Sequence, residues 1–284
     1  MITGAARVAG VVGWPVAHSL SPLIHNAWIE ALGLDAVYVP FAVPPAGFEA
    51  FIRGLDNEVV RGLNVTLPHK LAAFRLAGEV SEQAVRTRSA NLLTFEKTGV
   101  YGRSTDGEGL VSAIAAACPP EKLRGSAAVV LGAGGAAQAA VGALLDYGAS
   151  DVRVVARRKE AAYALATTFE GDAVSDYGFG ALGAALTGAG LVVNATAAGL
   201  NGEGELPPMD AAPREAVFMD MVYKPLLTQF LRDAAARGHL TVDGLAMLIG
   251  QARPSFEAFF GVAPPPEDVV NVRALCLRAL GETA

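Results

Sequence analysis

The sequence predicts an α/β protein with two domains, the second of which is of the Rossmann type. At 284 residues the chain exceeds the size of most single domains. Short apolar runs alternate with longer segments of helical period, which is typical of a parallel sheet covered by helices. A glycine-rich turn at 132–137 follows one of these apolar runs directly. Together these features predict an N-terminal αβ domain followed by a domain built on a parallel sheet.

The first domain begins with the apolar run at 8–13, which we predict to be a strand. A helix is expected at 21–32, where apolar residues recur at helical spacing. Ser21 is placed to cap its N-terminus, and Pro22 is at the first helical position. The remaining strands of this domain are expected at 36–42, 62–65 and 91–95. A helix at 107–117 follows, with Asp106 at the junction of the two domains.

The second domain begins with a predicted strand at 127–131 and a helix that runs to Tyr147. Further along the chain, a strand is expected at 152–156, a helix at 159–169, and strands at 191–194 and 217–220. Beyond Gly244 the pattern predicts helices, interrupted by the three prolines at 264–266 and ending with a helix at 269–280.

The composition favours an ordered globular protein whose main partner is not nucleic acid. A net charge of -6 argues against nucleic acid as the main partner, because phosphate backbones are bound by clustered Lys and Arg. Cys118 and Cys276 lack the spacing of a disulfide framework or a zinc site, and we interpret both as inert core thiols. The N-terminus has no secretory pattern and no apolar run is long enough to span a membrane. We therefore expect a cytoplasmic protein, monomeric or homodimeric, with no membrane partner.

The glycine-rich turn predicts a dinucleotide site. In Gly132-x-Gly134-x-x-Ala137 the glycines allow a tight turn and let the backbone approach a pyrophosphate at the helix N-terminus. The alternative is a closely packed strand-to-helix turn in an Ala- and Gly-rich protein. The order strand, turn, helix and second strand favours the dinucleotide.

The end of the following strand indicates which dinucleotide is bound. NAD sites usually place a carboxylate there, whereas the 2'-phosphate of NADP needs cations. Here the strand leads into Arg157 and Arg158, which can form charge-assisted hydrogen bonds with a phosphate. We predict NADP(H), against the alternative of a solvated basic helix start.

Polar side chains follow two strands of the first domain. Ser19 and Ser21 come after the first strand, where their hydroxyls can bind a carboxylate. Asn64, Thr66 and Lys70 lie at the end of the strand at 62–65, and Lys70 is a candidate acid or base. Ligands of α/β proteins usually bind at such strand ends.

Two further groups of residues have competing interpretations. Asp106 is either a functional group at the domain junction or the N-cap of the next helix. His18, His25 and His69 lack metal-ligand spacing, so we assign no metal and expect hydrogen-bonded structural roles.

Six blocks of the sequence together resemble the shikimate dehydrogenase family in order and spacing. They are His18-Ser-Leu-Ser-Pro-Leu-Ile-His25-Asn-Ala, Asn64-Val-Thr-Leu-Pro-His-Lys70, Ser104-Thr-Asp106, Gly132-Ala-Gly-Gly-Ala, Asn194-Ala-Thr196 and Gln251-Ala. The resemblance covers essentially the whole chain. It implies the reversible NADPH-dependent reduction of 3-dehydroshikimate to shikimate, a step of aromatic amino acid biosynthesis.

The resemblance also implies roles for single residues and domains. Lys70 and Asp106 correspond to the catalytic pair. The residues expected to bind the substrate are Ser19, Ser21, Asn64, Thr66, Asn91, Tyr223 and Gln251. Those expected to bind the cofactor are Gly132, Ala133, Gly134, Gly135, Ala136, Arg157, Arg158, Asn194, Thr196 and Gly244. The C-terminal helices should pack back on the first domain, which gives a substrate domain of residues 1–105 with 245–284 and a dinucleotide domain of 106–244.

Departures from the family pattern leave two alternatives open. The family usually reads Gly-Ala-Val-Asn-Thr where this chain has 88–92, and Asn-Arg-Thr where it has 156–158; Ser104 and Leu200 replace the usual Asn and Met. One alternative is a quinate/shikimate dehydrogenase paralogue that uses NAD. The other is a non-catalytic NADP-sensing protein, against which the retained Lys70 and Asp106 argue.

Overall fold

The computed structural model describes residues 2–55, 59–169 and 173–282. The chain forms two compact domains, residues 1–105 with 251–284 (the N-terminal domain) and residues 106–250 (the Rossmann domain). The second division lies six residues beyond the predicted one at 244. It falls inside helix α11 (Gly244–Phe260) because the first residues of this helix pack into the Rossmann domain: Met247 belongs to its core, and Gly250 lies directly against Gly109 and Ser112.

The sheet of the N-terminal domain has the strand order β2-β1-β3-β5-β6-β4. Its strands are β1 (Arg7–Gly13), β2 (Ala36–Ala42), β3 (Val60–Val65), β4 (Glu79–Val80), β5 (Leu92–Glu96) and β6 (Gly99–Arg103). β1, β2 and β3 are parallel, whereas β5 runs antiparallel to both β3 and β6. The sheet is therefore mixed, because a turn of two residues joins β5 to β6 and such a short connection permits only antiparallel pairing. β4 and β6 were not predicted, because both are short and only partly buried.

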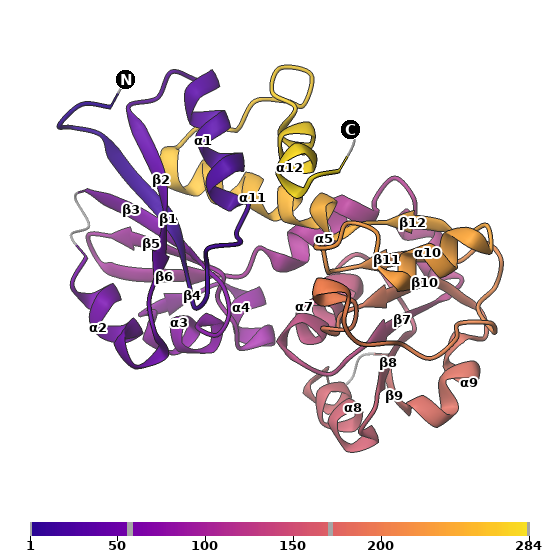
Figure 1. Cartoon of the computed structure of the whole chain (residues 1–284). Helices are drawn as coiled ribbons and strands as arrows, with labels where there is room; N and C mark the ends of the chain where they lie inside the picture. Colours follow the sequence, from indigo (N-terminus) through magenta and orange to yellow (C-terminus); the bar gives the residue numbers. More distant parts are fainter. Residues whose placement is uncertain (1, 56–58, 170–172, 283–284) are drawn as a thin grey trace. The chain divides into compact units, whose positions relative to one another are not determined.

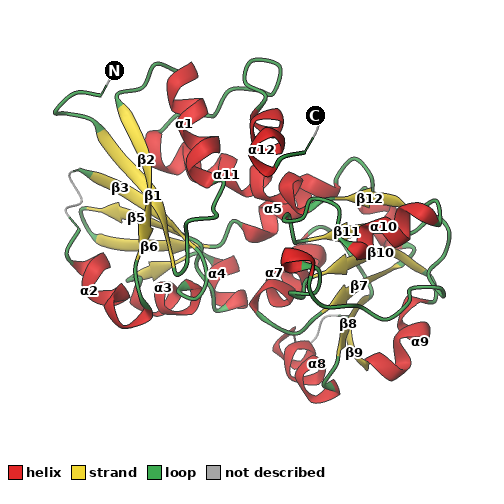
Figure 2. Cartoon of the chain, viewed as in Figure 1, coloured by secondary structure: helices red, strands yellow, loops and turns green. Residues whose placement is uncertain are grey.

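Helices cover both faces of this sheet (Figures 1 and 2). They are α1 (Ser21–Ala31), α2 (Phe48–Arg53), α3 (Lys70–Leu76), α4 (Glu82–Thr87), α12 (Val272–Leu280) and the end of α11, with a 3-10 turn at Pro45–Gly47. On one face, Phe48 and Ile52 of α2 and Ala73 of α3 pack against Leu63 and Leu93. α12 lies against α1, as expected for C-terminal helices that pack back on the first domain.

The sheet of the Rossmann domain is parallel throughout, in the order β12-β11-β10-β7-β8-β9. Its strands are β7 (Ala127–Leu131), β8 (Val152–Ala156), β9 (Val174–Gly178), β10 (Ala189–Asn194), β11 (Val217–Asp220) and β12 (Leu240–Val242). In chain order this is the doubly wound arrangement, in which the direction of winding reverses between β7 and β10. β9 and β12 were not predicted.

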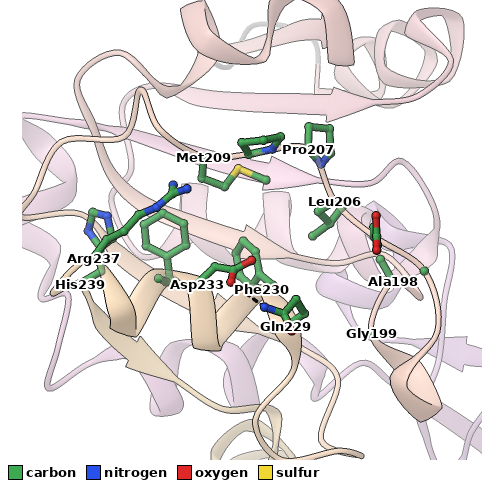
Figure 3. Close-up of a pocket in the computed structure, with 15 residues that line it drawn as sticks. Ala198, Gly199, Leu206, Pro207, Met209, Gln229, Phe230, Asp233, Arg237 and His239 are labelled. Atoms are coloured by element: carbon green, nitrogen blue, oxygen red, sulfur yellow. Dashed lines mark hydrogen bonds between the residues drawn. The ribbon is translucent and has the colours of Figure 1, made fainter.

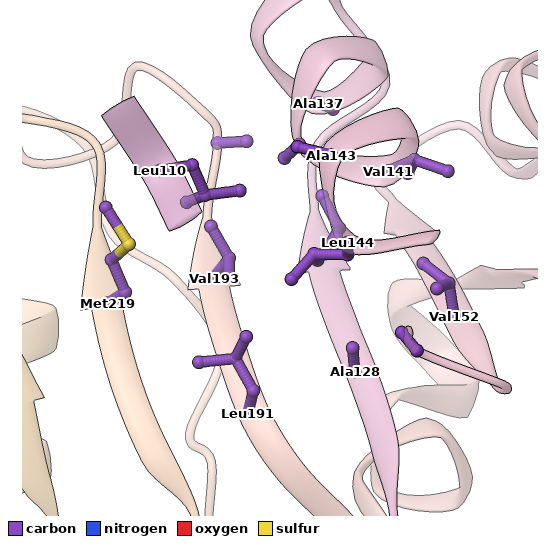
Figure 4. Packing of buried hydrophobic residues seen from close by; sticks show 14 of the residues in the cluster. Leu110, Ala128, Ala137, Val141, Ala143, Leu144, Val152, Leu191, Val193 and Met219 are labelled. Carbon is purple, nitrogen blue, oxygen red and sulfur yellow. The ribbon is translucent and has the colours of Figure 1, made fainter. Parts of the chain in front are cut away.

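Two layers of helices enclose this sheet. They are α5 (Asp106–Ile114), α6 (Pro120–Arg124), α7 (Gly135–Asp146), α8 (Lys159–Ala166), α9 (Leu182–Leu186) and α10 (Gln229–Ala236), with 3-10 turns at Thr167–Phe169, Phe179–Ala181 and Leu200–Gly202. Leu110 of α5 and Leu144 of α7 pack against Val193 on one face (Figure 4). On the other face, Leu186 of α9 and Phe230 of α10 join a second cluster. The inner strands β7, β8, β10 and β11 are buried on both faces, which explains their continuous apolar runs.

The structure confirms most predicted elements and corrects their ends. Ser21 does not cap α1: it is the first helical residue with a buried side chain, and its amide donates to the hydroxyl of Ser19 at 3.3 Å. α5 starts at Asp106 and stops at Ile114, so Asp106 is part of the first turn. Cys118 and Cys276 are both buried free thiols, as predicted, and burial raises the pKa of Cys276 to about 11.

His25 differs from its expected hydrogen-bonded role. Its ring lies in the core between α1, β2 and α11, stacked on Tyr38 with ring centroids 4.1 Å apart and near Trp28, Phe256 and Phe259. Within the described part of the chain, neither ring nitrogen has a hydrogen-bond partner. Burial lowers the pKa of His25 to about 3, because the charged imidazolium cannot be solvated there. His69, in contrast, is hydrogen-bonded as expected, through Nε2 to the carbonyl of Val43 at 2.8 Å.

We predict that His25 makes the stability of the protein sensitive to acid. The pKa of His25 is about 3 in the folded state against 6.5 for the free side chain. The contribution of the buried neutral ring to folding stability is therefore complete above pH 6.5 and is lost as the pH falls towards 3, because the unfolded chain takes up the proton first. Between pH 7 and 5 the free energy of unfolding should fall by roughly 2 kcal/mol more for the wild type than for His25→Phe. Denaturant unfolding at both pH values measures this difference. His18→Gln, at an exposed position, should behave as the wild type, and an equal pH slope for His25→Phe would contradict the prediction.

Candidate active site

The first group of predicted site residues lies where the winding of the N-terminal sheet changes direction. β1 pairs with β2 on one side and with β3 on the other, so the connections that leave β1 and β3 diverge. Ser19 and Ser21 follow β1, and Thr66 follows β3. The amide of Thr66 donates to the carbonyl of Val12 at 2.9 Å, which ties the two strand ends together. The ends of β1 and β3, which carry these residues, are thus next to each other; the binding of a substrate there stays a prediction.

Asn64 is held firmly at this edge by protein partners. Its Oδ1 accepts from the hydroxyl of Tyr38 at 2.9 Å, and its Nδ2 donates to Ser255 Oγ at 2.8 Å and to the carbonyl of Asn91 at 3.2 Å. Tyr38 also meets the hydroxyl of Ser21, and burial raises the pKa of Tyr38 well above its ordinary value. A neutral tyrosine thus links the strand that carries Asn64 to the helix that begins with Ser21.

Asn91 connects three segments of the N-terminal domain. Its Oδ1 accepts from the amide of Thr105 at 2.7 Å and its Nδ2 donates to Thr105 Oγ1 at 3.0 Å. The Thr105 hydroxyl in turn donates to the carbonyl of Gln251 at 3.3 Å. Asn91 and Gln251 are both nearly buried. Asn91 is therefore fixed beside Gln251 even though the sequence around it departs from the family pattern.

Lys70 is the first residue of α3 and is partly buried. Its carbonyl accepts from the amide of Ala90 at 3.1 Å, which places the start of α3 next to Asn91. The preceding residue, His69, donates its amide to the carbonyl of Thr66 at 3.0 Å and stacks on Phe48. Thr66, Lys70 and Asn91 are thus neighbours through backbone contacts of a rigid core.

Asp106 and Tyr223 belong to the Rossmann domain. Asp106 follows Thr105 directly in the chain and lies in the first turn of α5. Tyr223 is partly buried in the loop between β11 and α10. The pairing of Asp106 with Lys70 and the approach of Tyr223 to a substrate therefore stay predictions.

The glycine turn lies at the carboxyl end of β7, beside the switch point of the Rossmann sheet. Gly132 has φ of +116°, a backbone conformation that favours glycine, and its amide donates to the carbonyl of Val155 at 2.8 Å. α7 begins after Gly134, and no side chain in the described part of the chain caps it. Its first amides are thus available to an anion, while Gly134 and Gly135 leave open space beside them. The turn fits the pyrophosphate of a dinucleotide.

Asn194 and Thr196 form a second turn, at the end of β10, that lies against the glycine turn. Asn194 Oδ1 accepts from the amide and hydroxyl of Thr196 at 3.0 and 2.7 Å. A Cβ atom on Gly132 would lie 3.0 Å from the carbonyl oxygen of Ala195 and 3.2 Å from the Thr196 methyl group. The two predicted cofactor segments are therefore in contact across the switch point.

Arg157 and Arg158 occupy the turn between β8 and α8, on the other side of the glycine turn. Both side chains are exposed, and Arg158 precedes the first residue of the helix. The bond from Gly132 to Val155 joins the glycine turn to the end of β8, two residues before Arg157. The cations are thus at the position expected to bind the 2'-phosphate of NADP.

Comparison with known proteins identifies the family. One family model, the shikimate dehydrogenase substrate binding domain, matches residues 11–93, and a second, shikimate / quinate 5-dehydrogenase, matches residues 114–212. A shikimate dehydrogenase (NADP(+)) of Caulobacter vibrioides is 51% identical over 283 residues, which cover 99% of this chain and 98% of the relative. The chain belongs to the shikimate dehydrogenase family. The resemblance noted in six sequence blocks is thereby confirmed.

Solved structures share the fold of the whole chain. The shikimate 5-dehydrogenase of Thermus thermophilus, crystallised with NADP(H) and shikimate, has a TM-score of 0.84 and 35% identity and covers 95% of this chain and 100% of its own. A quinate dehydrogenase of Corynebacterium glutamicum in complex with NAD has a TM-score of 0.85 and 27% identity, covering 96% and 99%. The architecture is thus common to family members with different substrates and cofactors.

A separate groove of about 360 Å³ lies on the α10 side of the Rossmann domain (Figure 3). Apolar side chains that include Leu206, Met209 and Phe230 line it, and among the described residues none of those predicted for the site does. Two of its charged lining residues have protein partners, since Arg237 pairs with Asp210 and the side chain of Gln229 donates to that of Asp233. This groove is not the candidate active site.

Over the described residues, no helix is long and apolar enough to cross a membrane.

Three residues that hold predicted site residues in place were not predicted. Tyr38 joins Ser21 to Asn64, Thr105 joins Asn91 to Gln251, and the buried carboxylate of Asp220 accepts from Asn194 at 3.0 Å. Asp220 is the last residue of β11, just as Asn194 is the last residue of β10. Its polar side chain at a strand end could therefore have indicated a role at the site. Tyr38 and Thr105 gave no such signal, because their partners are distant in sequence.

Proposed function

We propose that this chain catalyses the reversible NADPH-dependent reduction of 3-dehydroshikimate to shikimate. The observation that carries the proposal is the near full-length similarity to an NADP-dependent shikimate dehydrogenase, at 51% identity. The two strand-end clusters supply the groups that this reaction needs. A water-soluble substrate and cofactor suit a cytoplasmic enzyme that acts as a monomer or homodimer.

In the N-terminal domain, hydroxyl and amide groups of the sheet edge bind the substrate. Ser19 and Ser21 donate to its carboxylate, while Thr66, Lys70, Asn91 and Gln251 bind the ring hydroxyls. Asn64 has protein partners at both ends of its amide, so its contribution is to hold Asn91 and the strand end in place. Tyr223 reaches the substrate from the loop that follows β11. Because the buried amides are already oriented, little side-chain entropy is lost on binding.

Lys70 and Asp106 carry out the acid–base part of the reaction. NADPH supplies the hydride to the ketone carbon when it is bound. The ammonium group of Lys70 stabilises the negative charge that develops on the ketone oxygen and gives the proton that completes the alcohol. The carboxylate of Asp106 hydrogen-bonds the substrate and orients the ammonium group of Lys70. In the reverse direction the same pair removes the proton.

The Rossmann domain provides the cofactor site. The backbone of Gly132, Ala133, Gly134, Gly135 and Ala136 receives the pyrophosphate at the start of α7. The guanidinium groups of Arg157 and Arg158 bind the 2'-phosphate. Asn194, Thr196 and Gly244, on the opposite side of the glycine turn, hold the nicotinamide half.

Initial rates with shikimate and quinate, each with NADP+ and NAD+, test the proposed function. We expect strong turnover with shikimate and NADP+, and at most weak turnover in the other three combinations. The basic cluster favours the 2'-phosphate of NADP+, and quinate would need room for its extra hydroxyl beside Ser19 and Ser21. Turnover of quinate, or preference for NAD+, would assign the chain to the paralogous activity instead. Inactivity in all four assays, with NADPH still bound in a fluorescence titration, would indicate a sensor.

The role of Lys70 predicts a selective loss of turnover in Lys70→Ala. Removal of a general acid lowers kcat by roughly 100-fold or more. The circular dichroism spectrum and the thermal midpoint should stay as in the wild type, since Lys70 is only partly buried. Lys97→Ala, in the exposed turn between β5 and β6, is the matched control and should keep full activity. Unchanged kcat in Lys70→Ala would remove this lysine from the mechanism.

The basic cluster predicts a change in cofactor selectivity. In the double variant Arg157→Ala, Arg158→Ala, the KM for NADPH should rise by about tenfold or more, because charge-assisted hydrogen bonds to the phosphate are lost. The KM for NADH, which lacks that phosphate, should change little. Arg214→Ala, also exposed in the Rossmann domain, serves as the control. Equal losses with both cofactors would contradict the assignment of the 2'-phosphate site.

A further inference from the structure

Asp220, at the carboxyl end of β11, has a completely buried carboxylate. Its Oδ1 accepts from Asn194 Nδ2 at 3.0 Å and from the amide of Val222 at 2.9 Å, and its Oδ2 accepts from Thr228 Oγ1 at 2.5 Å. Burial raises the pKa of Asp220, and the three donors oppose that shift. Since a buried charge is costly even when it is paired, stability alone gives little reason for a carboxylate here.

Through Asn194, the carboxylate of Asp220 holds the turn at the end of β10. Asn194 also donates to the carbonyl of Ala198 at 3.1 Å, and the hydroxyl of Thr196 accepts from the amide of Ala198 at 3.0 Å. The side chain of Asn194 thus joins Asp220 to a closed turn that lies in contact with Gly132. A displacement of Asp220 would move this turn relative to the glycine turn.

Through Val222 and Thr228, the same carboxylate holds the loop 221–228, which carries Tyr223. Thr228 caps α10, and its side chain lies 3.1 Å from where a Cβ atom of Gly199 would be. A Cβ atom on Gly244 would lie 2.6 Å from the carbonyl oxygen of Val222, so the start of α11 fits tightly against this loop. Four segments therefore meet around one carboxylate, namely 194–199, 221–223, the N-terminus of α10 and the start of α11.

The sheet order shows which half of a dinucleotide these segments would face. β8, with Arg157 at its end, is on one side of β7, and β10 and β11 are on the other. A cofactor that has its pyrophosphate on the glycine turn and its 2'-phosphate on Arg157 extends its nicotinamide half towards β10 and β11. The turn at Asn194 and the loop with Tyr223 border that half.

We propose that Asp220 is a positioning residue that sets the place of the nicotinamide half of NADPH, by fixing the turn at 194–199 and the loop 221–228 together. The inference rests on the proposed cofactor site. Asp220 does not touch the cofactor, and its effect is transmitted by Asn194 and Thr228. Loss of the carboxylate should misplace the hydride donor while leaving the adenosine half bound normally.

The test compares Asp220→Ala, Asp220→Asn and Thr228→Val with the exposed control Asp233→Asn on α10. The measurements are kcat, the KM for NADPH, and the dissociation constants of NADPH and of adenosine 2',5'-bisphosphate, a probe that lacks the nicotinamide half. In Asp220→Ala we expect kcat to fall roughly tenfold or more and NADPH to bind less tightly, because small misplacements of reacting groups are costly. Binding of the bisphosphate should be unchanged.

The conservative variants refine the expectation. The amide oxygen of Asp220→Asn can still accept from Asn194 and Val222, so its kcat should lie between those of the wild type and Asp220→Ala. Thr228→Val removes one donor and should lower kcat less than Asp220→Ala. If Asp220→Ala does not fold, these two variants carry the test. Wild-type kinetics in all three variants would overturn the proposal. An equal loss of NADPH binding and of bisphosphate binding would overturn it as well, because it would indicate a general loosening of the domain.

Two controls separate this inference from the proposed function. A wild-type protein that neither binds NADPH nor turns over shikimate contradicts the proposed function itself. If the wild type is active but Asn194→Ala keeps its kinetics, the turn at 194–199 is not part of the cofactor site, and the role of Asp220 is overturned with it. If Asn194→Ala is impaired while Asp220→Ala is not, only the inference about Asp220 fails.

Discussion

The arrangement of both sites depends on the divergence of chain connections at the carboxyl ends of neighbouring parallel strands. In the N-terminal sheet this happens between β1 and β3, and in the Rossmann sheet between β7 and β10. At such a point no connection covers the strand ends, so side chains and backbone amides there can face a ligand. The predicted serines follow β1 and the glycine turn follows β7, so both strand ends carry the polar groups that a ligand would meet.

Behind these edges lies a layer of polar side chains whose partners are other protein groups. Asn64, Asn91 and Asp220 are almost completely buried, and each joins segments that come from different parts of the chain. A buried polar group is stable only when its hydrogen bonds are made, so each of them admits few arrangements of its neighbours. The expected result is a set of binding groups that is already ordered before a ligand arrives. His25 is the exception: among the residues that the structure describes its ring has no hydrogen-bond partner, burial keeps it neutral, and it stacks on Tyr38.

Charge is distributed differently from these neutral networks. Lys70, Asp106, Arg157 and Arg158 remain at least partly exposed, where an ionised side chain keeps its hydration until a ligand displaces it. The proposed binding of the 2'-phosphate and the proposed proton transfer both use such groups. The orienting residues behind them are neutral, except for Asp220, whose three donors replace water.

Apolar periodicity and short motifs are local properties of the chain, and they were enough to predict the fold class, most of the strands, most of the longer helices and the family. The sequence also placed Ser19, Thr66 and Lys70 at strand ends, and the glycine turn and Arg157 in their order along the second domain. The burial of Ser21 in the first turn of α1, the antiparallel direction of β5 and the domain boundary within α11 became known only from the folded chain. It alone revealed the links from Tyr38 to Asn64 and from Asp220 to Thr228. Such links are made by side chains that meet only after the sheets have formed, so no local pattern encodes them.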